Sequence, residues 1–175
     1  MSIPKVYIAC LAAYNAGFLH GQWIDLDGTV DLDEEISKVL KSSPEADAGE
    51  WAVHDFEYCV GLCEYTGSNT LKEIIAAYEA CDRSNIEWEP FIRFCEHLDE
   101  NPAEKQVVAF QEAYAGKDEN LEAWAIDFIQ DTGGIEGMHE HLRFYFNYEA
   151  YARDLEINDV FTVEHKQDVL VFWRH

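Results

Sequence analysis

The sequence predicts an α+β protein. Runs of β-branched and aromatic residues lie near both ends of the chain, and amphipathic helical patterns fill the middle. Of the 175 residues, 48% are apolar and 14% aromatic, which is enough to form a packed interior. A chain of this length fits one large domain or two to three small ones.

The first third of the chain has the pattern of a small antiparallel sheet with one helix. Lys5–Leu11 and Phe18–Leu26 are rich in strand-forming residues and flank a turn-like segment, Tyr14–Gly17, so we predict a hairpin. Asp31–Lys41 has apolar residues at near-helical spacing and acidic residues in its first turn, where the helix dipole favours them. Trp51–Tyr58 is predicted to form a third strand.

The middle third is predicted to be helical. Thr70–Glu73 has the pattern of a capping box at the start of one helix, and Pro90 suits the first turn of a second. Asn101-Pro102 is expected to open a third helix, with Tyr114 on its inward face and Gly116 as its end.

The last third mixes helices with a closing strand. Asn120 is predicted to cap a helix that Gly133-Gly134 terminates. A longer helix is expected at about His139–Leu155. The β-branched and aromatic run Val169–Trp173 is predicted to be a strand.

The charge is strongly and evenly negative. The formal net charge is −23, and residues 1–60, 61–115 and 116–175 contribute −8, −7 and −8. Solubility needs a net charge of only about 2–8 in a small domain, and a larger value opposes compaction. Nucleic acids and anionic membranes repel such a chain, so we expect neither as a direct partner.

The cysteines and the apolar runs indicate a cytoplasmic protein. The five cysteines are odd in number and widely spaced, so we expect reduced and mostly buried thiols. No leader is expected before the first strand, and no apolar run approaches the roughly 20 residues of a membrane span.

One segment resembles a catalytic motif. Trp23–Val30 is similar to the DxDGT motif of haloacid-dehalogenase-type phosphatases, in which Asp25 would be the nucleophile, Asp27 the general acid and Mg²⁺ the counterion. That chemistry needs a parallel sheet, a later Lys and a downstream acidic pair. The chain instead precedes the motif with a predicted hairpin, so we favour a strand end that runs into a solvated turn.

Metal-binding patterns are incomplete. Gly28 is the fourth residue counted from Asp25, whereas a calcium loop needs glycine at the sixth position. His139-Glu140-His141 lacks the i, i+4 spacing of a zinc protease. Cys59 and Cys63 could face one another on a helix, but two ligands make no structural zinc site. We therefore expect no metal, no cofactor and no catalytic residue.

Three stretches carry a family resemblance. They are Val6–Asp25, with its Tyr14-Asn15-Ala16-Gly17 and Leu19-His20-Gly21-Gln22-Trp23-Ile24-Asp25 segments, then Glu50–Glu57, and Glu140–Leu155. Together with Glu112-Ala113-Tyr114 they span nearly the whole chain. The sequence resembles the ArdA antirestriction proteins, which mobile genetic elements carry. It departs from them at Asn147, where Asp is expected, and at Lys117 and Asn120, in a segment that is often more acidic.

The resemblance implies a non-enzymatic, elongated protein of three small units. These would be an N-terminal α+β unit (1–60), a helical middle (61–115) and a mixed C-terminal unit (116–175). It also implies a homodimer joined through the C-terminal units and curved like bent B-form DNA. The expected target is a type I restriction–modification enzyme, bound in the DNA groove of its methyltransferase core.

The residues expected to mimic phosphates form three acidic sets. The first is Asp25, Asp27, Asp31, Asp33, Glu34 and Glu35. The second is Glu45, Asp47, Glu50, Asp55 and Glu57. The third is Glu96, Asp99, Glu100, Glu104, Asp118, Glu119, Glu122 and Asp127. The alternative function is a generic acidic adaptor or chaperone of basic proteins, which would not depend on the spacing of its charges.

Overall fold

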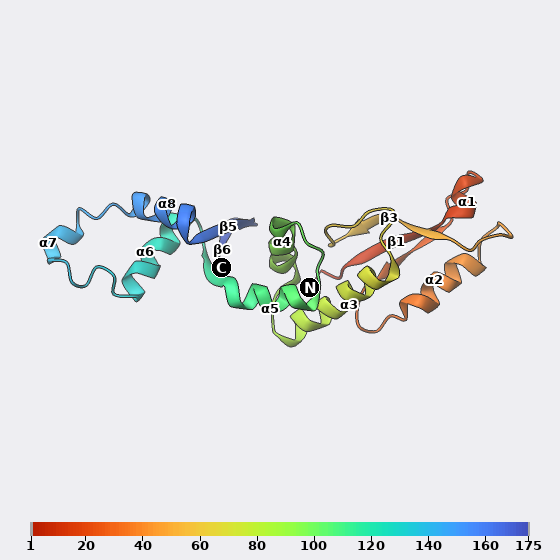
Figure 1. Cartoon of the computed structure of the whole chain (residues 1–175), viewed down its shortest axis with the longest axis horizontal. Coiled ribbons are helices and arrows are strands. Elements are labelled where there is room, and N and C mark those ends of the chain that lie inside the picture. The colour runs from red at the N-terminus through yellow and green to blue at the C-terminus, as the bar shows by residue number, and fades with distance from the viewer. Residues whose placement is uncertain (1, 175) are drawn as a thin grey trace. The chain divides into compact units, whose positions relative to one another are not determined.

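The computed structural model describes residues 2–174, which form eight helices and two three-stranded antiparallel sheets (Figure 1). The predicted α+β class is therefore confirmed. The chain divides into two compact units, Met1–Val108 and Ala109–His175. The division into three units and the elongated form remain predictions. Within residues 2–174 no helix is long and apolar enough to cross a membrane.

The first unit begins with the predicted antiparallel sheet. Strands β1 (Lys5–Cys10), β2 (Gly21–Asp25) and β3 (Trp51–Glu57) pair in the order β2-β1-β3. The connection between β1 and β2 differs from the predicted tight turn, because a short helix, α1 (Leu11–Asn15), follows β1 directly. The segment from Phe18 onward was predicted to be strand, but β2 starts only at Gly21.

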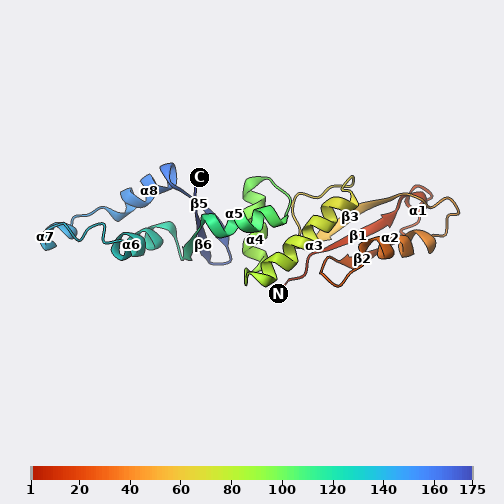
Figure 2. The ribbon, with the colours of Figure 1, turned by 60° about the horizontal axis from the view of Figure 1, so that its bottom comes forward.

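Helix α2 (Leu32–Lys41) packs on one face of this sheet and buries Leu32, Ile36 and Val39. The predicted helix is confirmed together with its acidic first turn, and Asp31 Oδ1 caps it by accepting a hydrogen bond from the Glu34 amide at 3.0 Å. Helix α3 (Ser68–Arg83) lies on the same side of the sheet as α2, and no helix of the described part of this unit covers the opposite face (Figures 1 and 2).

Three helices follow the sheet. Helix α3 begins at Ser68 with Gly67 as its N-cap, so the predicted capping box at Thr70 is wrong by one turn. Helix α4 (Trp88–Leu98) has Pro90 in its first turn, as predicted. The Trp88 indole N–H donates to the Tyr58 carbonyl at 2.7 Å, which ties α4 to the end of β3.

Helix α5 (Glu104–Ala113) ends earlier than the sequence suggests. Tyr114, predicted to face inward on this helix, is 39% exposed and starts strand β4 (Tyr114–Asp118). Gly116, predicted to stop the helix, lies inside β4 with φ of 135°. Pairing of β4 with a distant strand therefore overrides the local helical pattern.

The second unit packs helices against a second sheet. Strands β4, β5 (Val160–His165) and β6 (Asp168–Trp173) pair in the order β4-β6-β5, and β6 matches the predicted closing strand. Helix α6 (Leu121–Asp131) is capped by Asn120, as predicted, and ends shortly before Gly133. Its buried Trp124 and Ala125 pack in one core with residues of α8, β5 and β6.

The long helix predicted at His139–Leu155 is wrong, because the chain forms two separate helices there. These are α7 (Glu140–Arg143) and α8 (Tyr148–Asn158). The Asn147 side chain accepts a hydrogen bond from the Ala150 amide at 2.9 Å, so it is the N-cap of α8 as a separate helix. The Arg143 guanidinium turns back to donate to the carbonyls of Met138 and Glu136.

Candidate acidic interaction surface

The acidic side chains lie on the surface of both units. Within residues 2–174, Gln106 is the only polar or charged residue that is buried, and no Asp or Glu belongs to the core. An ionised carboxylate loses several kcal/mol of hydration when it is buried without a partner, so the core excludes it. The charge of −23 is thus presented to solvent.

The first predicted set lies along a continuous stretch of the first unit. Asp25 ends β2, Asp27 occupies the following loop, and the others start α2. Asp27 Oδ1 accepts hydrogen bonds from the Thr29 amide at 2.9 Å and from the Thr29 hydroxyl at 2.7 Å. Asp25 and Asp31 are exposed, while Asp27 and Glu35 are half-buried. The local fold therefore brings this set together.

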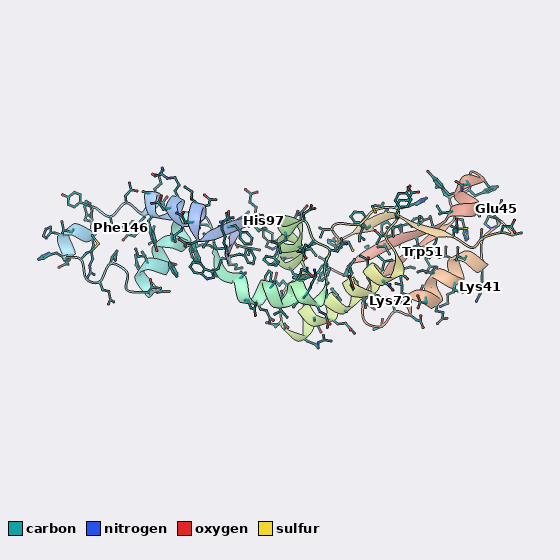
Figure 3. All side chains as sticks on the ribbon, viewed as in Figure 1. Lys41, Glu45, Trp51, Lys72, His97 and Phe146 are labelled. Carbon is teal, nitrogen blue, oxygen red and sulfur yellow. The ribbon has the colours of Figure 1, made fainter. Side chains whose placement is uncertain are left out.

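The second set lies in the same unit, on β3 and on the loop that leads to it. Glu45, Asp47 and Glu50 come from the loop, and Asp55 and Glu57 come from β3 itself. The loop borders an open groove of about 590 Å³ between α2 and the start of β3, where Figure 3 labels Lys41, Glu45 and Trp51.

The third set is split between the two units. Glu96, Asp99, Glu100 and Glu104 lie at the end of α4 and the start of α5 in the first unit. The other members belong to the second unit, where Asp118 ends β4, Glu119 follows it, and Glu122 and Asp127 lie on α6. Most of these side chains are exposed. Continuity of the set across the chain remains a prediction.

Lysine and arginine side chains pair with part of this surface. Lys38 Nζ lies 3.0 Å from Glu34 and 2.7 Å from Glu35, and its hydrogen bond lowers the pKa of the Glu35 carboxyl. Further ion pairs join Lys5 to Glu57, Lys72 to Asp33, Arg83 to Glu104, Arg93 to Glu96 and Lys105 to Glu100. All of these pairs are at least partly exposed, so each contributes little to stability, and together they partly neutralise seven of the predicted acids.

Acidic residues of α3 that the sequence did not single out join the first set. Gly28 packs directly against the Glu79 side chain. Burial raises the pKa of Tyr78, and the nearby carboxylates of Asp82 and Asp27 raise it further. About fifty positions of sequence separate Asp27 from these residues, so no local pattern could have revealed their proximity.

The DxDGT segment does not have the surroundings of a phosphatase site. Strand β2 is an edge strand of an antiparallel sheet, whereas the phosphatase motif requires a parallel one. Asp27 is engaged in the turn that its hydrogen bonds to Thr29 form. Among residues 2–174, no group of three or more His, Cys, Asp or Glu side chains is arranged to hold a metal ion.

The cysteines are mostly buried, as expected. Cys10, Cys59, Cys81 and Cys95 are buried, and Cys63 is exposed. The proposed helical pairing of Cys59 with Cys63 is wrong, because both residues lie in the loop between β3 and α3. Burial raises the pKa values of the Cys59, Cys81 and Cys95 thiols to about 12.

These features define an α+β protein that carries its acidic side chains outside two small cores. A family model described as "Antirestriction protein (ArdA)" matches residues 6–168, so the chain belongs to the ArdA antirestriction family. This family is non-enzymatic, and its members interact with restriction enzymes. No curated protein matches the chain.

Proposed function

We propose that this antirestriction protein inhibits type I restriction–modification enzymes by occupying the DNA-binding groove of their methyltransferase core. In this proposal the carboxylates take the place of the phosphates of bent B-form DNA. The observation that carries the proposal is the exclusion of every Asp and Glu from the core. The acidic charge that the surface ion pairs leave unneutralised is therefore available to a basic groove.

Both units contribute to this negative surface. Residues 1–108 carry 21 acidic and 7 basic residues, and residues 109–175 carry 14 and 5, so their net charges are −14 and −9. A groove lined with Lys and Arg attracts such a chain over long range, which speeds the encounter with the enzyme. Recognition would rest on charge and shape without base contacts, which suits enzymes of differing DNA specificity.

Helical and strand geometry allow an approximate match to the phosphate pattern. Residues four apart on a helix are separated by about 6 Å of rise, and phosphates of one DNA strand advance by about 3.4 Å each. Asp31 and Glu35 are four residues apart at the start of α2, and Asp55 and Glu57 are two residues apart on β3. The match is one of charge density rather than of atomic positions.

We further propose that the active form is a homodimer joined through the C-terminal regions. The second unit exposes several large apolar side chains, namely Leu142, Phe144, Tyr145 and Ile157, with exposed fractions of 46%, 88%, 80% and 67%. Exposed apolar groups of this kind are typical of protein interfaces. Two chains together would carry about −46, the charge of about 80 Å of duplex at one phosphate per 1.7 Å.

The proposal is tested by competition for a purified type I methyltransferase core. We expect the protein to displace duplex DNA, with an affinity that weakens as salt concentration rises. Simultaneous binding of DNA and protein to one core, or binding that does not depend on salt, would contradict the proposal.

Grouped substitutions distinguish a mimic from a generic acidic adaptor. Single Asp→Asn or Glu→Gln changes should cost little, because exposed ion pairs each contribute about 0–1 kcal/mol. Neutralising Asp25, Asp27, Asp31, Asp33, Glu34 and Glu35 together should lower the affinity strongly and flatten its salt dependence. An adaptor with a single hot spot would instead lose nearly all binding at one or two residues.

A further inference from the structure

The face of the N-terminal sheet that lies opposite α2 has two aromatic rings among carboxylates. The register of β1 with β2 places Tyr7 opposite Trp23 and Lys5 opposite Asp25, and the register with β3 places Tyr7 opposite Asp55 and Lys5 opposite Glu57. Because side chains alternate along a strand, these six residues share one face. Their neighbours Val6, Ile8 and Ile24 point to the other face, on which α2 packs, and are buried.

This open face leaves a large aromatic surface in contact with solvent. Trp23 is 39% exposed, and its ring meets the ring of Tyr7 edge to face with centroids 5.7 Å apart. No helix of the described residues in this unit covers it (Figures 1 and 2). An exposed Trp in a rim of acidic groups offers a cation both a π face and counter-charges.

The chain places one of its own cations on this face. Lys5 Nζ lies 2.9 Å from Glu57 Oε2 and 5.9 Å from the centroid of the Trp23 ring. The hydrogen bond to Glu57 raises the pKa of Lys5. One base against Asp25, Asp55 and Glu57 leaves this face with a net charge of −2. The geometry thus suits ammonium or guanidinium groups, and its charge is not satisfied by Lys5 alone.

We infer that this open sheet face, defined by Lys5, Tyr7, Trp23, Asp25, Asp55 and Glu57, docks arginine side chains of the partner protein. Arginine suits the site better than lysine does, because its planar guanidinium stacks on an aromatic ring while donating to carboxylates at its edge. The inference rests on the proposed function. It adds that Tyr7 and Trp23 contribute to the affinity for the partner, whereas phosphate mimicry alone would involve only carboxylates.

The first test uses a hexa-arginine peptide and the whole protein, followed through the indole N–H signals in NMR spectra. We expect the peptide to shift the Trp23 signal, identified with Trp23→Phe, and to leave those of buried Trp88 and Trp124 in place. Trp23→Ala should weaken peptide binding about two- to five-fold, as expected for an exposed cation–π contact, and Trp23→Phe should weaken it less. A peptide that shifts other signals but not that of Trp23 overturns the inference.

Two matched pairs of variants separate a local site from general charge attraction. Lys5→Gln and Lys38→Gln each remove one base, but Lys38 lies on α2, so Lys5→Gln should tighten peptide binding at least two-fold more than Lys38→Gln. The doubles Asp25→Asn/Asp55→Asn and Glu119→Gln/Glu122→Gln each remove two exposed acids. The first should weaken binding more than the second. Equal effects within either pair would overturn the inference.

The same variants are then tested for binding to a type I methyltransferase core. The order of affinities found with the peptide should be reproduced. If the core binds the unaltered protein and Trp23→Ala alike, the docking inference fails while the proposed function stands. If the core does not bind the protein but the peptide results hold, the proposed function fails and the arginine-docking surface remains.

Discussion

Lys72 Nζ in α3 lies 2.6 Å from Asp33 Oδ2 in the first turn of α2 (Lys72 is labelled in Figure 3). The contact joins two helices on the same side of the N-terminal sheet, and the Lys72 and Asp33 side chains are 48% and 67% exposed. The acidic start of α2 thus lies beside α3, whose Glu79 and Asp82 lie close to the preceding loop. Acids from three segments therefore lie near one another on one side of the unit.

The first prediction concerns the strength of this ion pair. In a double-mutant cycle with Lys72→Gln and Asp33→Asn, the coupling free energy of unfolding should be below about 1 kcal/mol, because both groups are exposed. It should fall further as salt screens the charges. Urea denaturation of the four proteins measures this coupling. A coupling of several kcal/mol would contradict the prediction and would show that the ion pair stabilises the packing of α2 on α3.

The second prediction separates the capping role of Asp31 from its charge. Asp31→Ala should lower the free energy of unfolding by about 1 kcal/mol, because the Glu34 amide loses its acceptor. Asp31→Asn keeps an acceptor and should cost far less, so it serves as the matched control. Urea titrations of both variants give the comparison, and equal losses would contradict a capping role.

The third prediction concerns thiol reactivity. In the native protein near pH 8, a thiol-specific reagent should modify Cys63 rapidly and the four buried cysteines slowly. The pKa of about 12 for Cys59, Cys81 and Cys95 leaves almost no thiolate at that pH. Cys63→Ser should remove the fast phase. Rapid modification of two or more thiols in the folded protein would contradict the burial pattern.

The fourth prediction concerns stability in alkali. The folded pKa of Cys59, Cys81 and Cys95 is raised from 9.0 to about 12, so the unfolded chain releases these protons first. The stability from these thiols is fully present below pH 9 and is lost between pH 9 and 12, at about 1.4 kcal/mol per pH unit for each thiol. Unfolding free energies measured across this range should decline, and Cys81→Ala should flatten the decline.

The fifth prediction concerns salt. Raising the ionic strength from roughly 0.01 M to 0.15 M shortens the Debye length from about 30 Å to about 8 Å. Repulsion among the charges that make up −23 should weaken, so the melting temperature in sodium chloride should rise. A variant with its six acids between Asp25 and Glu35 neutralised should show a smaller rise. A constant or falling melting temperature would contradict strong self-repulsion.

The sequence predicted correctly those helices and strands that are determined by residues close together in the chain. Asp31 and Asn120 cap helices where expected, and strands at Lys5, Trp51 and Val169 form in nearly the predicted bounds. Strand β5 was missed although Val160–His165 is a strand-like run directly before β6. The turn between them contains Lys166 with φ of 59°, and a Lys there lacks the glycine or asparagine signal of a hairpin.

The features that the sequence did not predict depend on contacts between residues far apart in the chain. Strand β4 exists because it pairs with β6, more than fifty residues later, and this pairing ends α5 at Ala113. The exposure of the predicted acids could be expected from their chemistry, whereas the proximity of Asp27 to Glu79 and Asp82 depends on how α3 packs. The aromatic face at Trp23 needs the strand register, which hydrophobic patterning alone did not reveal.

The exclusion of carboxylates from both cores has an evolutionary consequence. A surface acid can be lost at one position and regained at a neighbouring one without repacking any buried side chain, so such changes cost the fold little. Descendants of this chain can therefore drift widely in the identity and placement of their acids while selection maintains only the density of charge. Buried positions tolerate fewer substitutions, because replacing a residue such as Trp88 or Phe172 with a smaller one leaves a cavity.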